Sequence, residues 1–214
     1  MKFIRLLIAG FLITNIVAAQ VDPKAQEILK SVSAKYKSYK TVAAKFKITV
    51  ADQKAKTTDN QTGSLILKGA KYKVIMGTQE IISDGKVIWT YLKDANEVQI
   101  NDPKSDPNSI SPNNIFTIYE TGFKSKYISE KVIGGKQMQI IELVPEDTKR
   151  NFFKVQLTIN KAEKYISQAI IYQKSGTNLT YAVQEFKPNA PADDVLFTFN
   201  KANYPGVEEV DLRN

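Results

Sequence analysis

Residues 62–91 read TGSLILKGAKYKVIMGTQEIISDGKVIWTY, and the pattern of this segment is the clearest indication of the fold. Its apolar and polar residues alternate with the period of two that is typical of a β-sheet exposed to water on one face. Turn signals at residues 68–70, 77–78 and 83–86 divide it into four short strands. The Asp84-Gly85 pair indicates a two-residue type I′ hairpin, because both central positions of that turn need a positive φ.

The residue pattern in the rest of the chain predicts further strands of the same sheet. Further strands are expected at residues 41–50, 97–100, 127–132, 138–144, 152–159, 165–172 and 179–186, and residues 52–61 are expected to form a hairpin loop. About ten or eleven closely spaced strands are typical of an antiparallel barrel or a strongly curved sheet. The chain shows no βαβ alternation, so a parallel α/β fold is excluded.

Two helices are predicted beside this sheet. The first begins at Asp22-Pro23 and is amphipathic as far as Tyr39. The second, shorter helix begins at Ser111-Pro112, after a loop at residues 101–114 that is rich in Asn, Asp, Ser and Pro, and it ends at Gly122. The first helix either packs on the sheet or covers the open side of a curved sheet.

Residues 1–19 have the pattern of a secretory leader. Basic residues are followed by an apolar run and by Val17-Ala18-Ala19, which places small residues at the −3 and −1 positions of a cleavage site. We therefore expect a cleaved signal peptide and one soluble domain over residues 20–214. The chain has no cysteine, so it lacks the lipid-anchoring box of a lipoprotein.

Composition argues against several functional classes. The chain has no histidine and no cysteine, so Ser-His-Asp catalysis, Cys-His catalysis and the usual zinc sites lack their residues. The net charge of +8 comes almost entirely from lysines on alternating positions, which indicates a solvated face rather than a nucleic-acid site. Acidic pairs are sequence neighbours, unlike the facing carboxylates of a glycosidase. We expect no enzymatic activity, metal, cofactor or nucleic-acid partner.

The chain resembles the outer-membrane lipoprotein carrier protein LolA family. The resemblance rests on G-x-L-x-L-K at residues 63–68, I-I-S-D-G-K-x-I-W-x-Y at residues 81–91, and a Phe-x-Phe…Pro-Gly-Val ending at residues 197–207. It covers most of the chain after the leader. It implies a mainly β fold: a half-open, unclosed antiparallel β-barrel with the N-terminal amphipathic helix and the short mid-chain helix forming a lid.

The resemblance also implies a function and partners. It implies a monomeric periplasmic carrier that takes acylated lipoproteins from an inner-membrane ABC lipoprotein exporter, touches membrane surfaces transiently and delivers its cargo to an outer-membrane acceptor. A LolA-like paralogue that binds or senses another envelope lipid is the alternative. A hydrolase or transferase acting on envelope lipids, and a structural envelope protein with a solid core, are two further hypotheses.

The resemblance implies that the apolar inner face is the wall of an acyl-chain cavity, whereas the residues alone favour an ordinary barrel core. The predicted cavity and lid residues are Leu29, Val32, Phe46, Ile48, Leu65, Leu67, Tyr72, Val74, Met76, Trp89, Tyr91, Ile115, Phe116, Tyr119, Phe153, Tyr172 and Tyr181. Family members commonly hold the lid closed with an arginine where this chain has Gly69. Lys68, Lys71 and Lys73 are the candidates to replace that latch.

Overall fold

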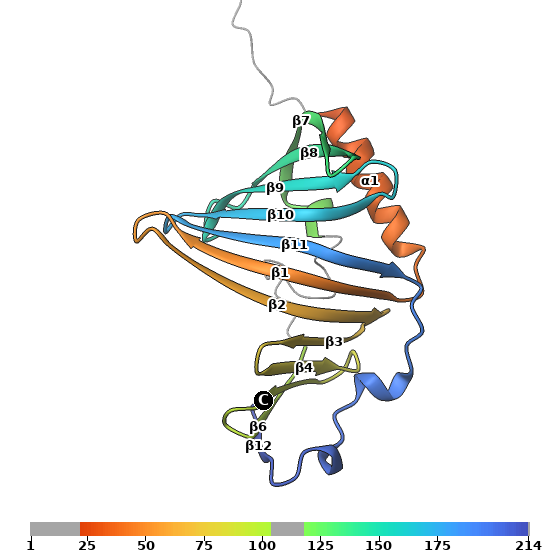
Figure 1. Ribbon diagram of the computed structural model, residues 1–214, viewed down its shortest axis with the longest axis vertical. Helices are drawn as coiled ribbons and strands as arrows, with labels where there is room; N and C mark the ends of the chain where they lie inside the picture. The colour runs from red at the N-terminus through yellow and green to blue at the C-terminus, as the bar shows by residue number, and fades with distance from the viewer. Residues whose placement is uncertain (1–21, 104–117, 214) are drawn as a thin grey trace, which may run out of the picture.

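The computed structural model describes residues 22–103 and 118–213, and one sheet of 12 strands dominates it (Figure 1). The strand order is β12-β6-β5-β4-β3-β2-β1-β11-β10-β9-β8-β7. The strands are β1 (Val42–Asp52), β2 (Thr57–Lys68), β3 (Lys71–Met76), β4 (Gln79–Ser83), β5 (Ile88–Leu92), β6 (Glu97–Asn101), β7 (Phe123–Ile133), β8 (Lys136–Pro145), β9 (Phe152–Asn160), β10 (Tyr165–Gln173), β11 (Thr177–Pro188) and β12 (Glu208–Asp211).

The predicted half-open antiparallel architecture is confirmed. β12 and β7 lie at the two ends of the strand order and do not pair with each other, so the sheet is not closed into a barrel. β12 is a strand that the sequence pattern did not predict, and it pairs with β6 in parallel. The predicted leader and most of the predicted lid helix, including Ile115 and Phe116, lie outside the described residues.

Two predicted turns differ from the structure. The expected loop at residues 52–61 is mostly strand, because β1 extends to Asp52 and β2 begins at Thr57. The side chains of residues 57–62 are all exposed, so their polarity reflects water on both faces of the strand. The type I′ hairpin is also wrong: residues 84–87 form a longer loop, in which Asp84 Oδ1 accepts hydrogen bonds from the backbone N–H groups of Lys86 and Val87 at 2.8 and 2.9 Å.

Helix α1 (Pro23–Lys37) packs against β7 and β10, and we call the face of the sheet that it covers the inner face (Figure 1). Asp22 is its N-cap, accepting from the backbone N–H groups of Lys24 and Ala25. The second carboxylate oxygen of Asp22 accepts a hydrogen bond from the Tyr127 backbone N–H at 2.7 Å, which ties the start of α1 to β7. These bonds lower the pKa of Asp22, the bond from Tyr127 contributing most.

The main hydrophobic core lies between α1 and the inner face. Its helix-covered part consists of Ala25, Leu29, Val32, Tyr36, Ile141, Leu143, Val155, Leu157, Ile159, Ile166 and Ile171, all buried. We call this set the helix-covered core. None of the described helices has both the length and the apolarity to cross a membrane.

A second, smaller core lies on the opposite, outer face. Residues 190–207, which we call the C-terminal strap, include the 3₁₀ helices η2 (Asp194–Phe197) and η3 (Lys201–Asn203), and η2 contacts β3 and β4 (Figure 1). Phe197 of this segment and Val98 of β6 are both 0% exposed. Both faces of the sheet at β3–β6 therefore bury apolar side chains.

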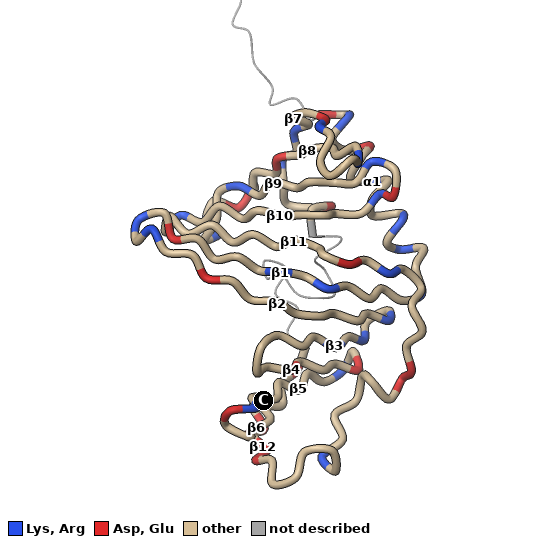
Figure 2. The backbone as a smooth tube through the Cα atoms, viewed as in Figure 1, with Lys and Arg blue, Asp and Glu red and all other residues tan. Residues whose placement is uncertain are grey.

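Charged side chains of both signs are spread along the strands and turns rather than gathered into one patch (Figure 2). Most of the ion pairs join partly exposed side chains, for example Lys136 with Glu163 and Lys161 with Glu130. Exposed pairs of this kind contribute little to stability. The excess of lysine is accordingly a property of the solvated surface.

Candidate site on the inner face of the sheet

Strand register places most of the predicted cavity residues on the inner face. Residues paired across antiparallel strands share a face. Leu65 pairs with Val74, and Val74 pairs with Ile81 on the next strand. Ile48 pairs with Tyr181 in the same way. The chain thus forms a continuous apolar stripe across β11, β1, β2, β3 and β4.

The inner face divides into two parts by burial. Of the predicted residues, Leu29, Val32, Leu67, Tyr72, Val74 and Tyr119 are buried. Phe46, Ile48, Leu65, Met76, Ile81, Leu179 and Tyr181 are only half-buried, and we call these seven residues the open patch. Apolar surroundings raise the pKa of the Tyr181 phenol, so it stays neutral at physiological pH. The open patch is a surface of aliphatic and aromatic side chains and can contact hydrocarbon.

Gly63 makes room for the Phe46 ring of this patch. It lies opposite Phe46 in the β1–β2 ladder. A Cβ at this position would be 2.6 Å from Phe46 Cζ and 2.7 Å from the Ile75 carbonyl oxygen. The first glycine of the G-x-L-x-L-K motif therefore lets the Phe46 ring lie flat across β2.

Trp89 and Tyr91, by contrast, lie on the outer face, and their prediction as cavity residues is wrong. Trp89 pairs with Ile82, whose neighbour Ile81 faces inward. The Tyr91 ring centroid lies 4.6 Å from that of Tyr204, in the C-terminal strap. The prediction failed because the strap covers the outer face of this strand, where it contacts the outward-facing Tyr91.

Phe153 and Tyr172 also lie on the outer face. Tyr172 pairs with Lys154, whose ammonium group is 4.5 Å from the tyrosine ring centroid. A register irregularity at this end of β9 and β10 turns Phe153 outward, where it is 51% exposed. The preceding residue, Phe152, takes the inner position and is 5% exposed.

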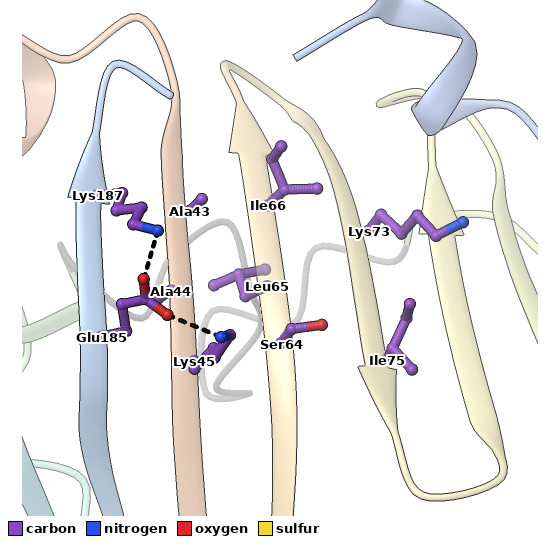
Figure 3. Close-up of a pocket in the computed structure, with 10 residues that line it drawn as sticks. All are labelled: Ala43, Ala44, Lys45, Ser64, Leu65, Ile66, Lys73, Ile75, Glu185 and Lys187. Carbon is purple, nitrogen blue, oxygen red and sulfur yellow. Dashed lines mark ion pairs between the residues drawn. The ribbon is translucent and has the colours of Figure 1, made fainter. Parts of the chain in front are cut away.

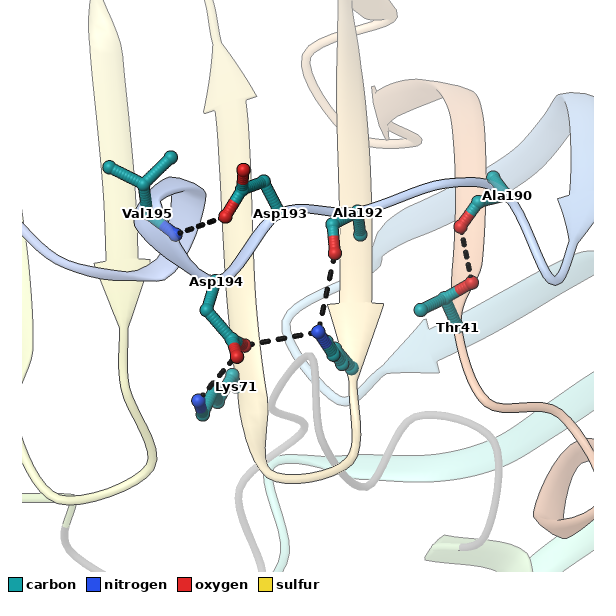
Figure 4. A network of polar contacts seen from close by, with 8 residues as sticks. Thr41, Lys71, Ala190, Ala192, Asp193, Asp194 and Val195 are labelled. Atoms are coloured by element: carbon teal, nitrogen blue, oxygen red, sulfur yellow. Dashed lines mark hydrogen bonds and ion pairs between the residues drawn. The ribbon is translucent and has the colours of Figure 1, made fainter.

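Of the three lysines proposed as lid latches, Lys68 and Lys71 bind the strap instead, and Lys73 pairs within the sheet. Lys68 and Lys71 both reach Asp194 Oδ1, at 3.1 and 3.0 Å, and Lys68 also donates to the Ala192 carbonyl oxygen (Figure 4). Lys73 pairs with Glu80 at 2.5 Å. Hydrogen bonds from Lys71 and then Lys68 lower the pKa of Asp194. The structure offers no support for these lysines as an inner-face latch, because their side chains leave the sheet on the outer face.

A shallow groove on the outer face contains charged side chains, unlike the apolar open patch. It occupies about 240 Å³ and is lined mainly by outward-facing side chains of β1, β2, β3 and β11, together with the inward-facing Ala44 and Leu65 (Figure 3). Glu185 lies between Lys45 and Lys187, and hydrogen bonds from Lys187 and then Lys45 lower its pKa to about 2. These fixed charges make the groove a poor site for hydrocarbon.

Sequence alternation missed two aromatic groups at opposite ends of the inner face. One consists of Tyr36, Tyr39, Tyr165 and Phe186, and the other consists of the stacked rings of Phe123 and Phe152. Strict alternation from Tyr181 would turn Phe186 outward, but a bulge opposite Lys45 and Phe46 adds a residue to β11 and turns Phe186 inward. Its ring then stacks on Tyr165 with centroids 4.8 Å apart. Nothing in the local sequence marks this bulge.

Comparisons with known proteins agree with this architecture. The profile of a family described as outer membrane lipoprotein carrier protein LolA matches residues 37–200. An uncharacterized conserved protein from Thermus thermophilus is 15% identical with a TM-score of 0.59, over 88% of this chain and 99% of its own. Lipoprotein LppX from Mycobacterium tuberculosis is 11% identical with a TM-score of 0.51, over 80% of this chain and 98% of its own.

A third similar structure is that of MucB in complex with MucA(peri), which is 13% identical with a TM-score of 0.50, over 82% of this chain and 60% of MucB. At these identities the three structures bear on the fold alone. A search of curated proteins finds no match. The family profile covers well over half of the chain and includes the strands that carry the open patch, so this protein belongs to the LolA family.

Proposed function

We propose that this protein is a periplasmic, non-enzymatic carrier that holds the acyl chains of lipoproteins against the open patch. The observation that supports this most directly is the half-buried state of seven apolar side chains on the same face that is fully packed beneath α1. Membership of the LolA family supports the same cargo class. The protein would receive lipoproteins from an inner-membrane ABC lipoprotein exporter and pass them to an outer-membrane acceptor, after export with a cleaved leader.

The open patch has the physical properties that such a carrier needs. Each buried methylene contributes about 0.8 kcal/mol, so an acyl chain of about fifteen carbons in water is uphill by roughly 10 kcal/mol. A carrier must cover most of this surface and still release it. Half-buried residues such as Leu65 and Ile48 provide apolar contact without a fully complementary pocket, which favours binding that is reversible.

The test is native mass spectrometry of the protein co-expressed with a lipoprotein, or with the same lipoprotein lacking its lipidation cysteine. We expect a complex only with the acylated form. Leu65→Asn, on the inner face, should strongly reduce the bound fraction, because an amide in the apolar stripe is costly. Ile66→Asn is the matched control, since Ile66 is the next residue on the same strand and pairs with Lys73 on the outer face.

Three other results would contradict or change this proposal. Equal binding of the unacylated lipoprotein would contradict the acyl-chain proposal. Co-purification of free lipids without any lipoprotein would favour the alternative, a LolA-like protein that binds or senses another envelope lipid. Equal effects of Leu65→Asn and Ile66→Asn would remove the open patch from the site.

A further inference from the structure

Arg150 carries a guanidinium group that the fold only partly buries. Its Nε and Nη1 atoms are buried, and neither has a hydrogen-bond partner among the described residues. The nearest acid in sequence is Asp147, whose carboxylate accepts a hydrogen bond from the Lys149 backbone N–H at 2.8 Å. Arg150 reaches Asp147 only by its backbone N–H, which donates to the Asp147 carbonyl oxygen at 3.4 Å. A buried donor without an acceptor costs stability, so these two atoms favour a ligand that brings one.

Aromatic rings hold the guanidinium in place from one side. Arg150 Cζ is 4.6 Å from the ring centroid of Phe123 and 5.6 Å from that of Phe152, and these two rings are stacked. A Cβ on Gly122 would be 3.4 Å from Arg150 Nη2, so the glycine leaves the planar group its space. Cation–π contact uses the face of the guanidinium and leaves its in-plane N–H groups unsatisfied.

A second unpartnered donor lies beside the hollow that Phe123 lines. The Tyr119 hydroxyl is buried and has no hydrogen-bond partner among the described residues, and Tyr119 is 4% exposed. Tyr119 and Phe123 both line a hollow of about 300 Å³ between α1 and the start of β7. Burial raises the pKa of the Tyr119 phenol, so it keeps its proton and remains a donor. Phe123 thus contacts Arg150 and lines the same hollow as Tyr119.

We propose that Arg150 binds the oxyanion, a phosphate or a carboxylate, of an acidic amphiphile whose acyl chains lie on the inner face. This inference rests on the proposed function, because the chains use the apolar face already described. An oxyanion supplies acceptors for donors that otherwise have none, and charge-assisted hydrogen bonds strengthen where apolar rings exclude water. A neutral acyl chain has no acceptor for these donors. The inference therefore adds to the proposed function that the cargo carries an anionic group beside its acyl chains.

The experiment is isothermal titration calorimetry of the delipidated protein with three ligands: dioctanoyl phosphatidylglycerol, dioctanoylglycerol and inorganic phosphate. We expect the phosphatidylglycerol to bind at least about tenfold more tightly than the neutral lipid. Arg150→Gln should abolish this preference while leaving the neutral lipid's affinity unchanged. Arg150→Lys should retain part of it, because the charge remains but the planar fork is lost. Arg213→Gln is the matched control, since Arg213 is exposed and paired with Asp211.

The three ligands and the arginine variants test this inference separately from the proposed function. Equal affinity for the two lipids, or a preference that survives Arg150→Gln, overturns the anion site and leaves the acyl-chain carrier standing. Failure of both lipids to bind overturns the carrier and the anion site together. Inorganic phosphate that binds as tightly as phosphatidylglycerol overturns the head-group assignment, because the site would then take a free anion.

Discussion

The helix-covered core and the open patch lie on the same face of one sheet, and the alternation of residues is the same in both. In the helix-covered core, Leu157 and Ile159 are 4% and 1% exposed beneath α1. In the open patch, Leu65 and Ile48 remain half-buried. In both parts, the alternation of residues determines which face a side chain occupies, whereas its burial depends on which element packs against that face. Binding surface and core are therefore not distinguished by residue type in this fold.

The largest expected difference between the two parts is in stability. Leu157→Ala should cost about 2–5 kcal/mol of unfolding free energy, because the substitution leaves a cavity in packed core. Leu65→Ala should cost roughly 1 kcal/mol, because its side chain is already partly in contact with water. Urea unfolding followed by circular dichroism measures both losses. Lipid binding should show the reverse order, with Leu65→Ala the more damaging; equal stability losses would show that the patch is ordinary core.

A methyl group at Gly63 is expected to have an intermediate effect. Gly63→Ala should destabilise the protein by about 1–3 kcal/mol, because the new Cβ meets a backbone oxygen as well as the Phe46 ring. The ring would have to leave its place across β2, and acyl-chain binding should fall as well. The double variant Gly63→Ala/Phe46→Leu should recover part of the stability. Unchanged stability in the single variant would mean that the Phe46 ring moves freely.

The sequence predicted the strands well because their signal is local. The alternation of Leu65, Leu67, Tyr72 and Val74 is enough to place all four on one face, and the structure confirms it. The same rule failed for Trp89 and Tyr91, because a strap more than a hundred residues later covers the other face. It also failed at Phe153 and Phe186, where strand irregularities change the phase. Local pattern carries no information about either effect.

Arg150 shows a further limit of sequence reasoning. As one of three arginines it is conspicuous in the composition, yet its importance comes from contacts with Phe123 and Phe152 on two different strands. No spacing within the sequence predicts that juxtaposition. The family's arginine position, here Gly69, has instead an open turn with a φ of +60° and no atoms near a Cβ.

The smallest expected effect concerns the hydrogen bonds that attach α1 to a neighbouring 3₁₀ turn. Glu120, in the 3₁₀ turn η1 (Ile118–Glu120), accepts hydrogen bonds from the Ser33 hydroxyl and from Lys37 Nζ, the latter at 2.7 Å. The bond from Lys37 and then the bond from Ser33 lower the pKa of Glu120. A carboxylate with a lowered folded-state pKa contributes stability that is fully present above the unfolded-state value, about 4.3, and is lost as the pH falls through the folded-state pKa.

Glu120→Gln should therefore lower the urea midpoint slightly, by nearly the same amount at pH 7 and pH 5, and the difference should shrink as the pH falls below about 4.3. The loss is small because the Glu120 side chain is 36% exposed and its Lys37 partner 62% exposed, so that water screens the pair. Glu27→Gln, on the exposed side of α1, is the control and should leave the midpoint unchanged. A difference for Glu120→Gln that does not shrink in acid would mean that the carboxylate charge does not hold the helix in place. The attachment of α1 would then rest on its apolar side chains and on the hydrogen bond from Tyr127 to Asp22.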